Sequence, residues 1–289
     1  MPGSLPIRPI PAVVTVMNDL PVNVIRVVGD SAGVIAIWKP AGLATQAPPG
    51  IPSAESWLRR ELHGESSRGY LGVPHRIDRG VSGVVLFAAT PRAARKLSRQ
   101  FERRQVRKSY LAIVTCGEAS RDTVAALVQA GDTANGAAAP ASAGAVTWCD
   151  WLEKIPEEAR ARLVAAGEPG GREAVTLARL CCRLSPDRLL PDRLLLELSP
   201  VTGRMHQLRL QAAARGLPIL GDDLYGVADD SWAGPLQPRE GDGSPDADPR
   251  MRPIALHASR ITYADPDTGS EVTIEAALPA YWPEAARCT

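Results

Sequence analysis

Proline and glycine recur along the whole chain, and they constrain its fold more than any other feature. The 289 residues include 26 Pro and 25 Gly, so the apolar segments between turns are short. This density argues against a helical bundle or a coiled coil. Aromatic residues make up only 4% of the chain, and we therefore expect a core built from Ala, Val, Leu and Ile.

The apolar segments predict more strands than helices. Gly83–Ala89 and Tyr110–Val114 are short and apolar, as buried strands are. Helices are predicted over Ser53–His63 and Thr90–Val106, each with a good N-cap residue, and over Met205–Arg215. Further strands are expected at 24–28, 34–38, 179–184, 194–198, 261–263 and 272–276. This order predicts an α+β fold with a mixed, mainly antiparallel central sheet, flanked by helices and loops.

The chain is predicted to consist of a Pro-rich N-terminal extension, residues 1–23, and one folded domain, residues 24–289. Within that domain, 130–144 and 228–250 are rich in small, polar or turn-forming residues and predict mobile loops. The N-terminus lacks the apolar core of a secretory signal, and no apolar run is long enough to span a bilayer. We therefore expect a cytoplasmic protein with no membrane partner.

Cysteine and histidine are too scattered to predict a metal site. The five Cys form no C-x-x-C pair, and only four His are present, whereas zinc sites need clustered ligands. An odd number of Cys without a signal peptide favours a reducing compartment. We expect neither a metal nor a cofactor.

The net charge of +1 hides two strongly charged segments. Between Arg92 and Lys108 there are eight basic residues and one acid, whereas Asp222–Asp248 holds eight acids and one Arg. A basic helix can neutralise phosphates of a nucleic acid. The alternative is an ordinary solvated helix surface, and charge by itself leaves both possibilities open.

Two polar clusters interrupt apolar sequence and are candidates for chemistry. In HRIDRGVSG, residues 75–83, Asp78 lies between Arg76 and Arg79 just before a predicted buried strand. This is either a reactive carboxylate or a salt-bridged turn. In TGRMHQLRL, residues 202–210, Arg204 and Arg209 flank a histidine and a glutamine. So many donors require acceptors nearby, for which Asp78, RNA phosphate and backbone carbonyls are the candidates.

These clusters resemble motifs of the RluA-type RNA pseudouridine synthases. HRIDRGVSG is similar to that family's HRLD-x-x-TSG signature, and four further matches follow the family's order along the chain. They are KPAG at 39–42, KSYLAIV at 108–114, TGRMHQLRLQAAARGLPILGDDLYG at 202–226 and LHA at 256–258. The resemblance implies the pseudouridine synthase fold and an isomerase that converts uridine in structured RNA.

The resemblance also implies roles for individual residues. Asp78 matches the aspartate that initiates cleavage of the uracil–ribose bond, and Tyr110 matches the tyrosine that stacks on the target base. Arg209 matches the basic residue that pairs with this aspartate, and Arg76 matches the arginine that helps to extrude the nucleotide. Arg204 and His206 are expected to bind RNA, although for His206 a purely structural role is equally compatible with the sequence.

The implied reaction agrees with the composition. Isomerisation breaks C1′–N1 and joins C1′ to C5, so no electrons or atoms are exchanged with a cofactor. The base must leave its stack, which calls for an aromatic surface and a displacing side chain. An aspartate carboxyl is already ionised at neutral pH, so Arg209 is expected to orient Asp78 and offset its desolvation.

The chain departs from the family pattern at three places. Val81 stands where the family usually has Thr, and about 38 residues precede KPAG, too few for the S4-like domain of many relatives. Residues 115–172 match poorly, so this segment either selects the RNA or packs on the sheet edge. Ribosomal and transfer RNA both stay open as substrates, and we expect a monomer.

Two other functional classes are weighed against the isomerase. A catalytically silent RNA-binding module would share the fold, but each matched catalytic position holds the required residue. A nucleoside hydrolase would also act at C1′, but it needs a second carboxylate or a metal to activate water, and none is suitably spaced. Free uracil among the products would indicate the hydrolase.

Overall fold

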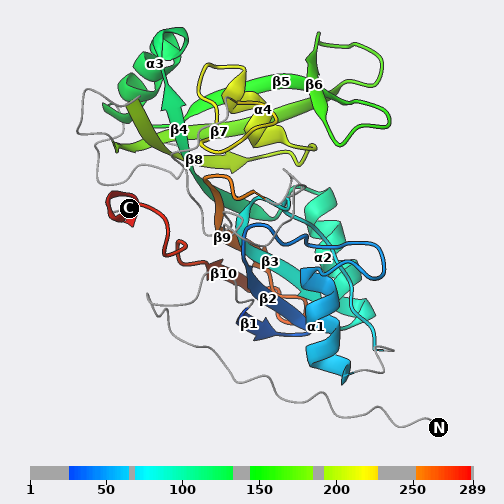
Figure 1. The fold of residues 1–289 in the computed structure, drawn as a ribbon. Helices are drawn as coiled ribbons and strands as arrows, with labels where there is room; N and C mark the ends of the chain where they lie inside the picture. The colour runs from blue at the N-terminus through cyan, green and yellow to red at the C-terminus, as the bar shows by residue number, and fades with distance from the viewer. Residues whose placement is uncertain (1–25, 65–68, 133–143, 185–191, 227–251, 288–289) are drawn as a thin grey trace, which may run out of the picture. The chain divides into compact units, whose positions relative to one another are not determined.

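The computed structural model describes residues 26–64, 69–132, 144–184, 192–226 and 252–287. The chain forms two compact units (Figure 1). Unit 1 comprises residues up to Val106 together with Ala258–Ala280, and unit 2 comprises Arg107–His257 together with the residues from Tyr281 onward. The predicted extension, residues 1–23, and most of both predicted mobile loops lie outside the described residues. A single domain over 24–289 stays a prediction.

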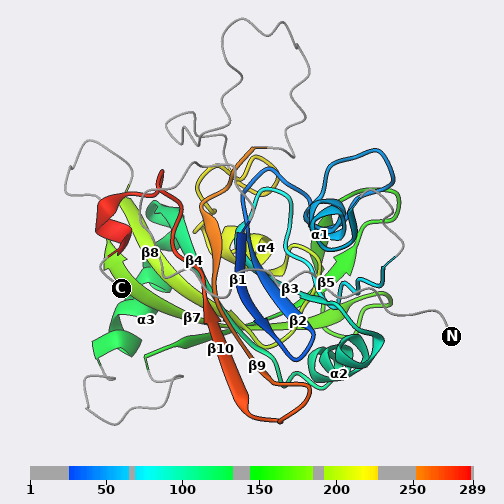
Figure 2. The same ribbon diagram turned by 90° about the horizontal axis from the view of Figure 1, so that it is seen from below.

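Unit 1 is built on β-sheet strands, with a fully buried strand near the middle of their order. Its strands are β1 (Arg26–Ser31), β2 (Val34–Lys39), β3 (Ser82–Ala88), β9 (Leu256–Ala264, from Ala258 on) and β10 (Glu271–Glu275). They follow the order β1-β2-β3-β9, with β10 paired to β9. Figure 2 shows β9 and β10 running side by side as a long hairpin. All seven residues of β3 are buried, as its continuous apolar sequence predicted.

The two helices of unit 1 begin where the sequence predicts. α1 (Ala54–His63) starts after Ser53, whose Oγ accepts a hydrogen bond from the backbone N–H of Ser56 at 3.1 Å. α2 (Pro91–Glu102) starts after Thr90, whose Oγ1 accepts from the backbone N–H of Ala93 at 3.1 Å. Each cap satisfies a donor that the first helical turn leaves free. Both helices lie beside the β2–β3 part of the sheet (Figure 1).

The prediction of one helix over Thr90–Val106 is wrong at its C-terminal end. α2 ends at Glu102, and Arg104 adopts the left-handed conformation with φ 57°. Val106 is buried, and the chain is extended from Arg107 onward. Burial of Val106 and the pairing of the following strand outweigh the helical propensity of this basic segment. The eight basic residues are therefore divided between a helix, a turn and a strand.

The strands of unit 2 pair with one another in antiparallel fashion. Its strands are β4 (Arg107–Cys116), β5 (Val146–Lys154), β6 (Ala161–Val164), β7 (Arg172–Arg183) and β8 (Asp192–Pro200). They follow the order β4-β8-β7-β5-β6, and all four pairings are antiparallel. The poorly matching segment 115–172 thus supplies the outer strands β5 and β6. The predicted mixed fold with a mainly antiparallel sheet is confirmed.

Two α-helices pack on the sheet of unit 2. α3 (Arg121–Asp132) follows a short 3-10 turn, η2 (Glu118–Ser120), and contacts β5 and β7. α4 (Gln207–Ala213) contacts β5 and β6. It is shorter than the predicted helix 205–215, and it begins only at Gln207 because His206 adopts a left-handed backbone with φ 51°. A last short turn, η4, covers Glu284–Arg287. In the part of the chain that the structure describes, no helix has the length and apolarity needed to cross a membrane.

We predict that Gly83→Ala severely destabilises unit 1. Gly83 has φ +120°, and a Cβ there would lie 2.6 Å from the backbone nitrogen of Ala258 on the neighbouring strand. Strain and overpacking together should lower the free energy of unfolding by about 3 kcal/mol or more. Urea unfolding measures this change. Gly50→Ala is the control, because Gly50 also has positive φ but nothing within 4 Å; equal losses in both variants would contradict the role of the close strand approach.

Candidate active site

The loop that carries Asp78 has no regular secondary structure, yet hydrogen bonds hold it on both sides. Thr45 Oγ1 donates to the carbonyl of Ile77 at 2.9 Å and accepts from its N–H at 3.2 Å. His75 Nε2 accepts from the backbone N–H of Leu86 in β3 at 2.9 Å. These bonds satisfy buried backbone groups that a loop would otherwise leave without partners. Asp78 therefore stands on a loop that is fixed to the sheet of unit 1.

A buried lysine also holds this loop, through a hydrogen bond to its backbone. Lys39, at the end of β2, is fully buried, and its Nζ donates to the carbonyls of Pro40 at 2.9 Å, Leu43 at 2.7 Å and Arg79 at 3.3 Å. Burial lowers the pKa of Lys39 to about 7, while the negative charge of Asp78 acts to raise it. The amine thus ties the KPAG turn to the backbone next to Asp78.

Arg76 lies in the same loop but points outward. Its side chain is exposed, and no described side chain forms an ion pair with it. Its neighbours His75 and Ile77 are held by the bonds given above, so the backbone at Arg76 is fixed while the guanidinium is accessible. This arrangement suits a side chain that reaches into a bound ligand.

In unit 2, Arg209 forms a bidentate ion pair with Asp222. Its Nε donates to Oδ2 at 2.7 Å, and a terminal guanidinium nitrogen donates to Oδ1 at 2.7 Å. The side chains are only 12% and 1% exposed, so the pair is held in one geometry. Asp222 Oδ1 also accepts from the backbone N–H of Leu224 at 3.1 Å. The acceptor for Arg209 in this unit thus comes from the first residue of the acidic segment Asp222–Asp248.

Tyr225 connects Arg209 to the histidine that precedes α4. The guanidinium carbon of Arg209 lies 5.3 Å from the centre of the Tyr225 ring, a cation–π contact. The Tyr225 hydroxyl lies 2.9 Å from His206 Nδ1 and accepts from the backbone N–H of Ala161 at 2.8 Å. His206 thus has a structural partner in addition to the RNA-binding role that the sequence suggested.

Arg204 is held by backbone rather than by an acid. Its Nε donates to the carbonyl of Glu173 at 2.9 Å, and its backbone N–H donates to Gln207 Oε1 at 3.0 Å. Gln207 Oε1 also accepts from the hydroxyl of Thr202 at 2.7 Å. The donors of the 202–210 cluster therefore find a carboxylate, a hydroxyl and backbone carbonyls as their partners.

Tyr110 lies on β4, opposite Leu198 of β8, and is partly exposed. Lys108 is two residues away and on the same face of the strand, and burial lowers its pKa. A Cβ at Gly203 would lie 3.8 Å from Lys108 Nζ, so this face of β4 is close to the loop before α4. Tyr110 thus shares unit 2 with Arg204, His206 and Arg209.

The six predicted site residues fall into two groups. Arg76 and Asp78 belong to unit 1, and Tyr110, Arg204, His206 and Arg209 belong to unit 2. The expected pairing of Arg209 with Asp78 joins the two units and stays a prediction. The sequence did not indicate the roles of Lys39, Asp222 and Tyr225, although all three lie within the motifs KPAG and GDDLYG.

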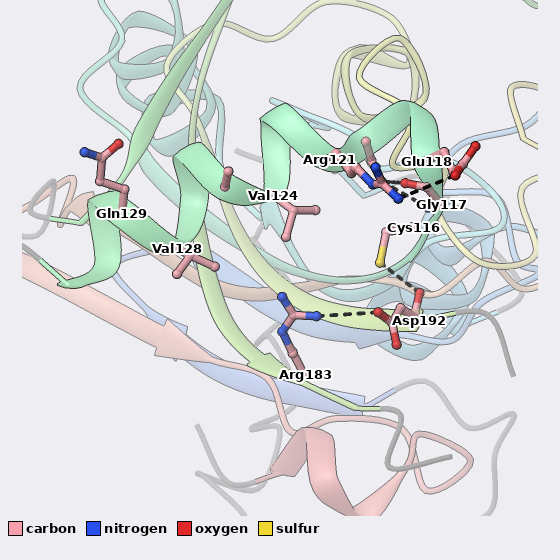
Figure 3. A pocket seen from close by; sticks show the side chains of 11 residues that line it. Cys116, Gly117, Glu118, Arg121, Val124, Val128, Gln129, Arg183 and Asp192 are labelled. Carbon is pink, nitrogen blue, oxygen red and sulfur yellow. Dashed lines mark hydrogen bonds and ion pairs between the residues drawn. The ribbon is translucent and has the colours of Figure 1, made fainter. Parts of the chain in front are cut away.

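A cavity of about 720 Å³ lies on unit 2, away from these residues (Figure 3). It is bordered by η2, α3 and the ends of β4, β7 and β8, with Cys116, Arg121 and Asp192 among its lining residues. Cys116 is six residues beyond Tyr110, about 20 Å along β4. None of the predicted site residues lines this cavity. Among the described residues, no group of three or more His, Cys, Asp or Glu is arranged to hold a metal.

Comparison with known proteins identifies one family. A family model described as RNA pseudouridylate synthase matches residues 33–214, a range that includes all six predicted site residues. The dual-specificity RNA pseudouridine synthase RluA of Haemophilus influenzae is 30% identical over 82% of this chain and 86% of its own length. The ribosomal large subunit pseudouridine synthase D of Xanthomonas campestris is 32% identical over 91% of this chain and 67% of its own length.

Solved structures show the same fold. Human RNA pseudouridylate synthase domain containing 4 has a TM-score of 0.58 at 21% identity, covering 90% of this chain and 89% of that one. Human RNA pseudouridylate synthase domain containing 1 has a TM-score of 0.59 at 20% identity, covering 91% of this chain and 87% of that one. At these identities the likeness concerns the fold.

We predict that Lys39→Met lowers the free energy of unfolding by about 2–4 kcal/mol. The substitution removes the amine that donates to the carbonyls of Pro40, Leu43 and Arg79. Thermal unfolding followed by circular dichroism measures the change. Lys154→Met is the control, because Lys154 is exposed and the same substitution there should change stability by less than about 0.5 kcal/mol. Similar stabilities of the two variants would refute the anchoring role of Lys39.

Proposed function

The chain belongs to the RNA pseudouridylate synthase family and is an isomerase that acts on RNA, and we propose that its reaction begins at Asp78. The observation that carries this proposal is the fixed loop: Thr45, His75 and Lys39 hold the backbone around Asp78. A group that must meet a ribose carbon at one position needs such pre-organisation. A salt-bridged surface turn would need none of these anchors.

In the proposed reaction, the C1′–N1 bond of a uridine breaks, the uracil turns, and a C1′–C5 bond forms. The proton lost from C5 is balanced by the proton gained at N1, so the RNA keeps its atoms and electrons. Asp78 initiates the cleavage, and Tyr110 stacks on the freed base and helps to move the C5 proton. No metal or cofactor takes part in this proposal.

The two arginines have different proposed tasks. Arg209 orients Asp78 and offsets its desolvation, and its own position is set by Asp222 and Tyr225. Arg76, exposed on a fixed backbone, occupies the space that the target nucleotide leaves in the RNA. Arg204 and His206 bind the RNA near the target.

We propose ribosomal RNA as the substrate, with transfer RNA as the alternative. Ribosomal RNA of the large subunit is named in the titles of several relatives, including synthase C of Rickettsia bellii, which is 30% identical over 86% of this chain and 67% of its own length. The relative from Haemophilus influenzae is described as dual-specific. The relatives named from sequence similarity are bacterial. We place this enzyme in the cytoplasm, where bacteria modify their RNA, and expect it to act as a monomer.

The first test is release of tritium from RNA labelled at uridine C5. The wild type should release tritium from unmodified ribosomal transcripts, because C5 loses its proton when it bonds to C1′. Asp78→Asn should abolish release while retaining the fold and RNA affinity, since the amide lacks the charge but matches the shape. Transfer RNA transcripts form the second pool, and the products are checked for free uracil.

The outcomes separate the candidate functions. Near-normal release by Asp78→Asn would show that Asp78 is not the catalytic residue. Binding without release from any pool would favour the silent RNA-binding module, and free uracil would favour the hydrolase.

A second prediction concerns Asp222 as a positioning residue for Arg209. Asp222→Asn removes the negative charge that holds the guanidinium, and we expect kcat to fall about 10- to 100-fold with a smaller change in KM. Asp223→Asn is the matched control, because its exposed neighbour Asp223 pairs with Arg252 at 3.1 Å. A purely structural Asp222 would instead lower the melting temperature and leave kcat of the folded enzyme intact, and Asp222→Glu, which keeps the charge, should recover part of kcat.

A further inference from the structure

Four arginines form a row along the outer face of α2. Arg92, Arg95, Arg99 and Arg103 are spaced by three or four residues, which places them on one side of a helix. All four are exposed. Arg103 is the C-cap residue, where the backbone leaves the helical conformation, with φ −83° and ψ 3°. We call this set the arginine stripe; at 1.5 Å per residue it extends about 16 Å.

The stripe is not neutralised by the rest of the described chain. Arg92 alone has an acidic partner, Asp267 at 3.2 Å, and both side chains are more than half exposed. Among the described residues, no acidic side chain pairs with Arg95, Arg99 or Arg103. The neighbouring Lys96 differs, because its amine is bonded to the carbonyl of Pro266.

Part of this arrangement is unfavourable for the helix itself. Arginines four residues apart, such as Arg95 and Arg99, repel one another. Arg92, in the first turn, lies at the end of the helix where the macrodipole disfavours positive charge. Arg99 and Arg103 lie at the C-terminal end, where the macrodipole favours positive charge. Helix stability therefore accounts for only part of the stripe, whereas binding of a polyanion accounts for all four arginines.

The opposite face of α2 limits what that polyanion is. No more than 1% of the surface of Ala93 or Leu97 is exposed, and α2 packs on β3. A helix that inserts into a lipid surface must present an apolar face to the bilayer, and here that face is used by the core. Guanidinium groups in a row instead suit the repeated phosphates of a nucleic acid strand.

The same helix contacts the loop of Asp78. The rings of Phe101, in α2, and His75 stack with centroids 4.7 Å apart, and His75 is three residues before Asp78. RNA held by the stripe is thus bound to the element that packs directly on the catalytic loop of the same unit. Because both belong to unit 1, binding at the stripe holds the RNA at a set position relative to Asp78.

We propose that the arginine stripe of α2 binds the phosphate backbone of the substrate RNA, independently of base sequence. The inference rests on the assignment of RNA as the substrate. It adds to the enzyme a docking surface outside the reacting residues, made of charge–phosphate contacts that position the RNA without specifying the base.

The test compares two triple variants that remove the same charge. Arg95→Gln, Arg99→Gln and Arg103→Gln together remove the stripe, and Gln retains good helix propensity. Arg60→Gln, Arg121→Gln and Arg172→Gln together form the control, because these arginines are exposed but scattered over the surface. Binding of a fluorescein-labelled RNA hairpin is measured by fluorescence anisotropy over a range of KCl concentrations.

We expect the stripe variant to bind the hairpin about 10- to 100-fold more weakly at low salt. The slope of log K against log [KCl] should become less steep by about 2 to 3, one unit for each lost phosphate contact. The control variant should keep the wild-type slope. Equal losses in the two variants, or no loss in the stripe variant, would overturn the proposal.

Two further measurements keep the inference separate from the catalytic assignment. In the tritium-release assay the stripe variant should show its loss in KM rather than in kcat, because it removes docking and not chemistry. If the wild type released no tritium, the assignment of Asp78 chemistry would fail while the anisotropy data would still test the stripe. Loss of binding to phosphatidylserine vesicles with an unchanged salt slope on RNA would assign the stripe to membranes and overturn the proposal.

Discussion

The hydrogen bonds from the buried amine of Lys39 support the part of unit 1 on which the proposed chemistry depends. The Asp78 loop leads into the fully buried strand β3, and it has no helix or strand pairing of its own to satisfy its backbone. Lys39 donates hydrogen bonds to the carbonyls of Arg79, Pro40 and Leu43. Moving a charged amine out of water is costly, so its burial is compatible with folding only because these oxygens, and the charge of Asp78, surround it.

In unit 2, a buried ion pair fixes the position of the Arg209 side chain in a comparable way. Asp222 is nearly inaccessible, holds the guanidinium by two bonds, and receives N–H bonds from the turn that follows it. Tyr225, within that turn, contacts both Arg209 and His206. In each unit, therefore, a buried charged side chain, Lys39 or Asp222, holds a segment or side chain of the proposed site.

The charge distribution follows the same division of tasks. A net charge of +1 gives no sign of a polyanionic partner, because acidic and basic segments cancel in the sum. In the structure, Asp222 is buried in unit 2 and pairs with Arg209. The arginine stripe lies exposed on the surface of α2. We propose that this surface charge binds the phosphates of RNA.

The sequence by itself determined the family motifs, the buried strand after Asp78, both capped helices of unit 1 and the mainly antiparallel sheet, because these depend on local patterns of apolar, capping and turn residues. It did not predict that α2 ends at Glu102, since burial of Val106 and strand pairing are tertiary effects. It also missed the strands β5 and β6, whose residues alternate weakly between buried and exposed positions. Only the tertiary structure decided that Lys39 supports the Asp78 loop and that Asp222 holds Arg209. Those partners lie 40 and 13 residues apart, and a hydrogen bond depends on where folding places two atoms, which no local pattern in the sequence records.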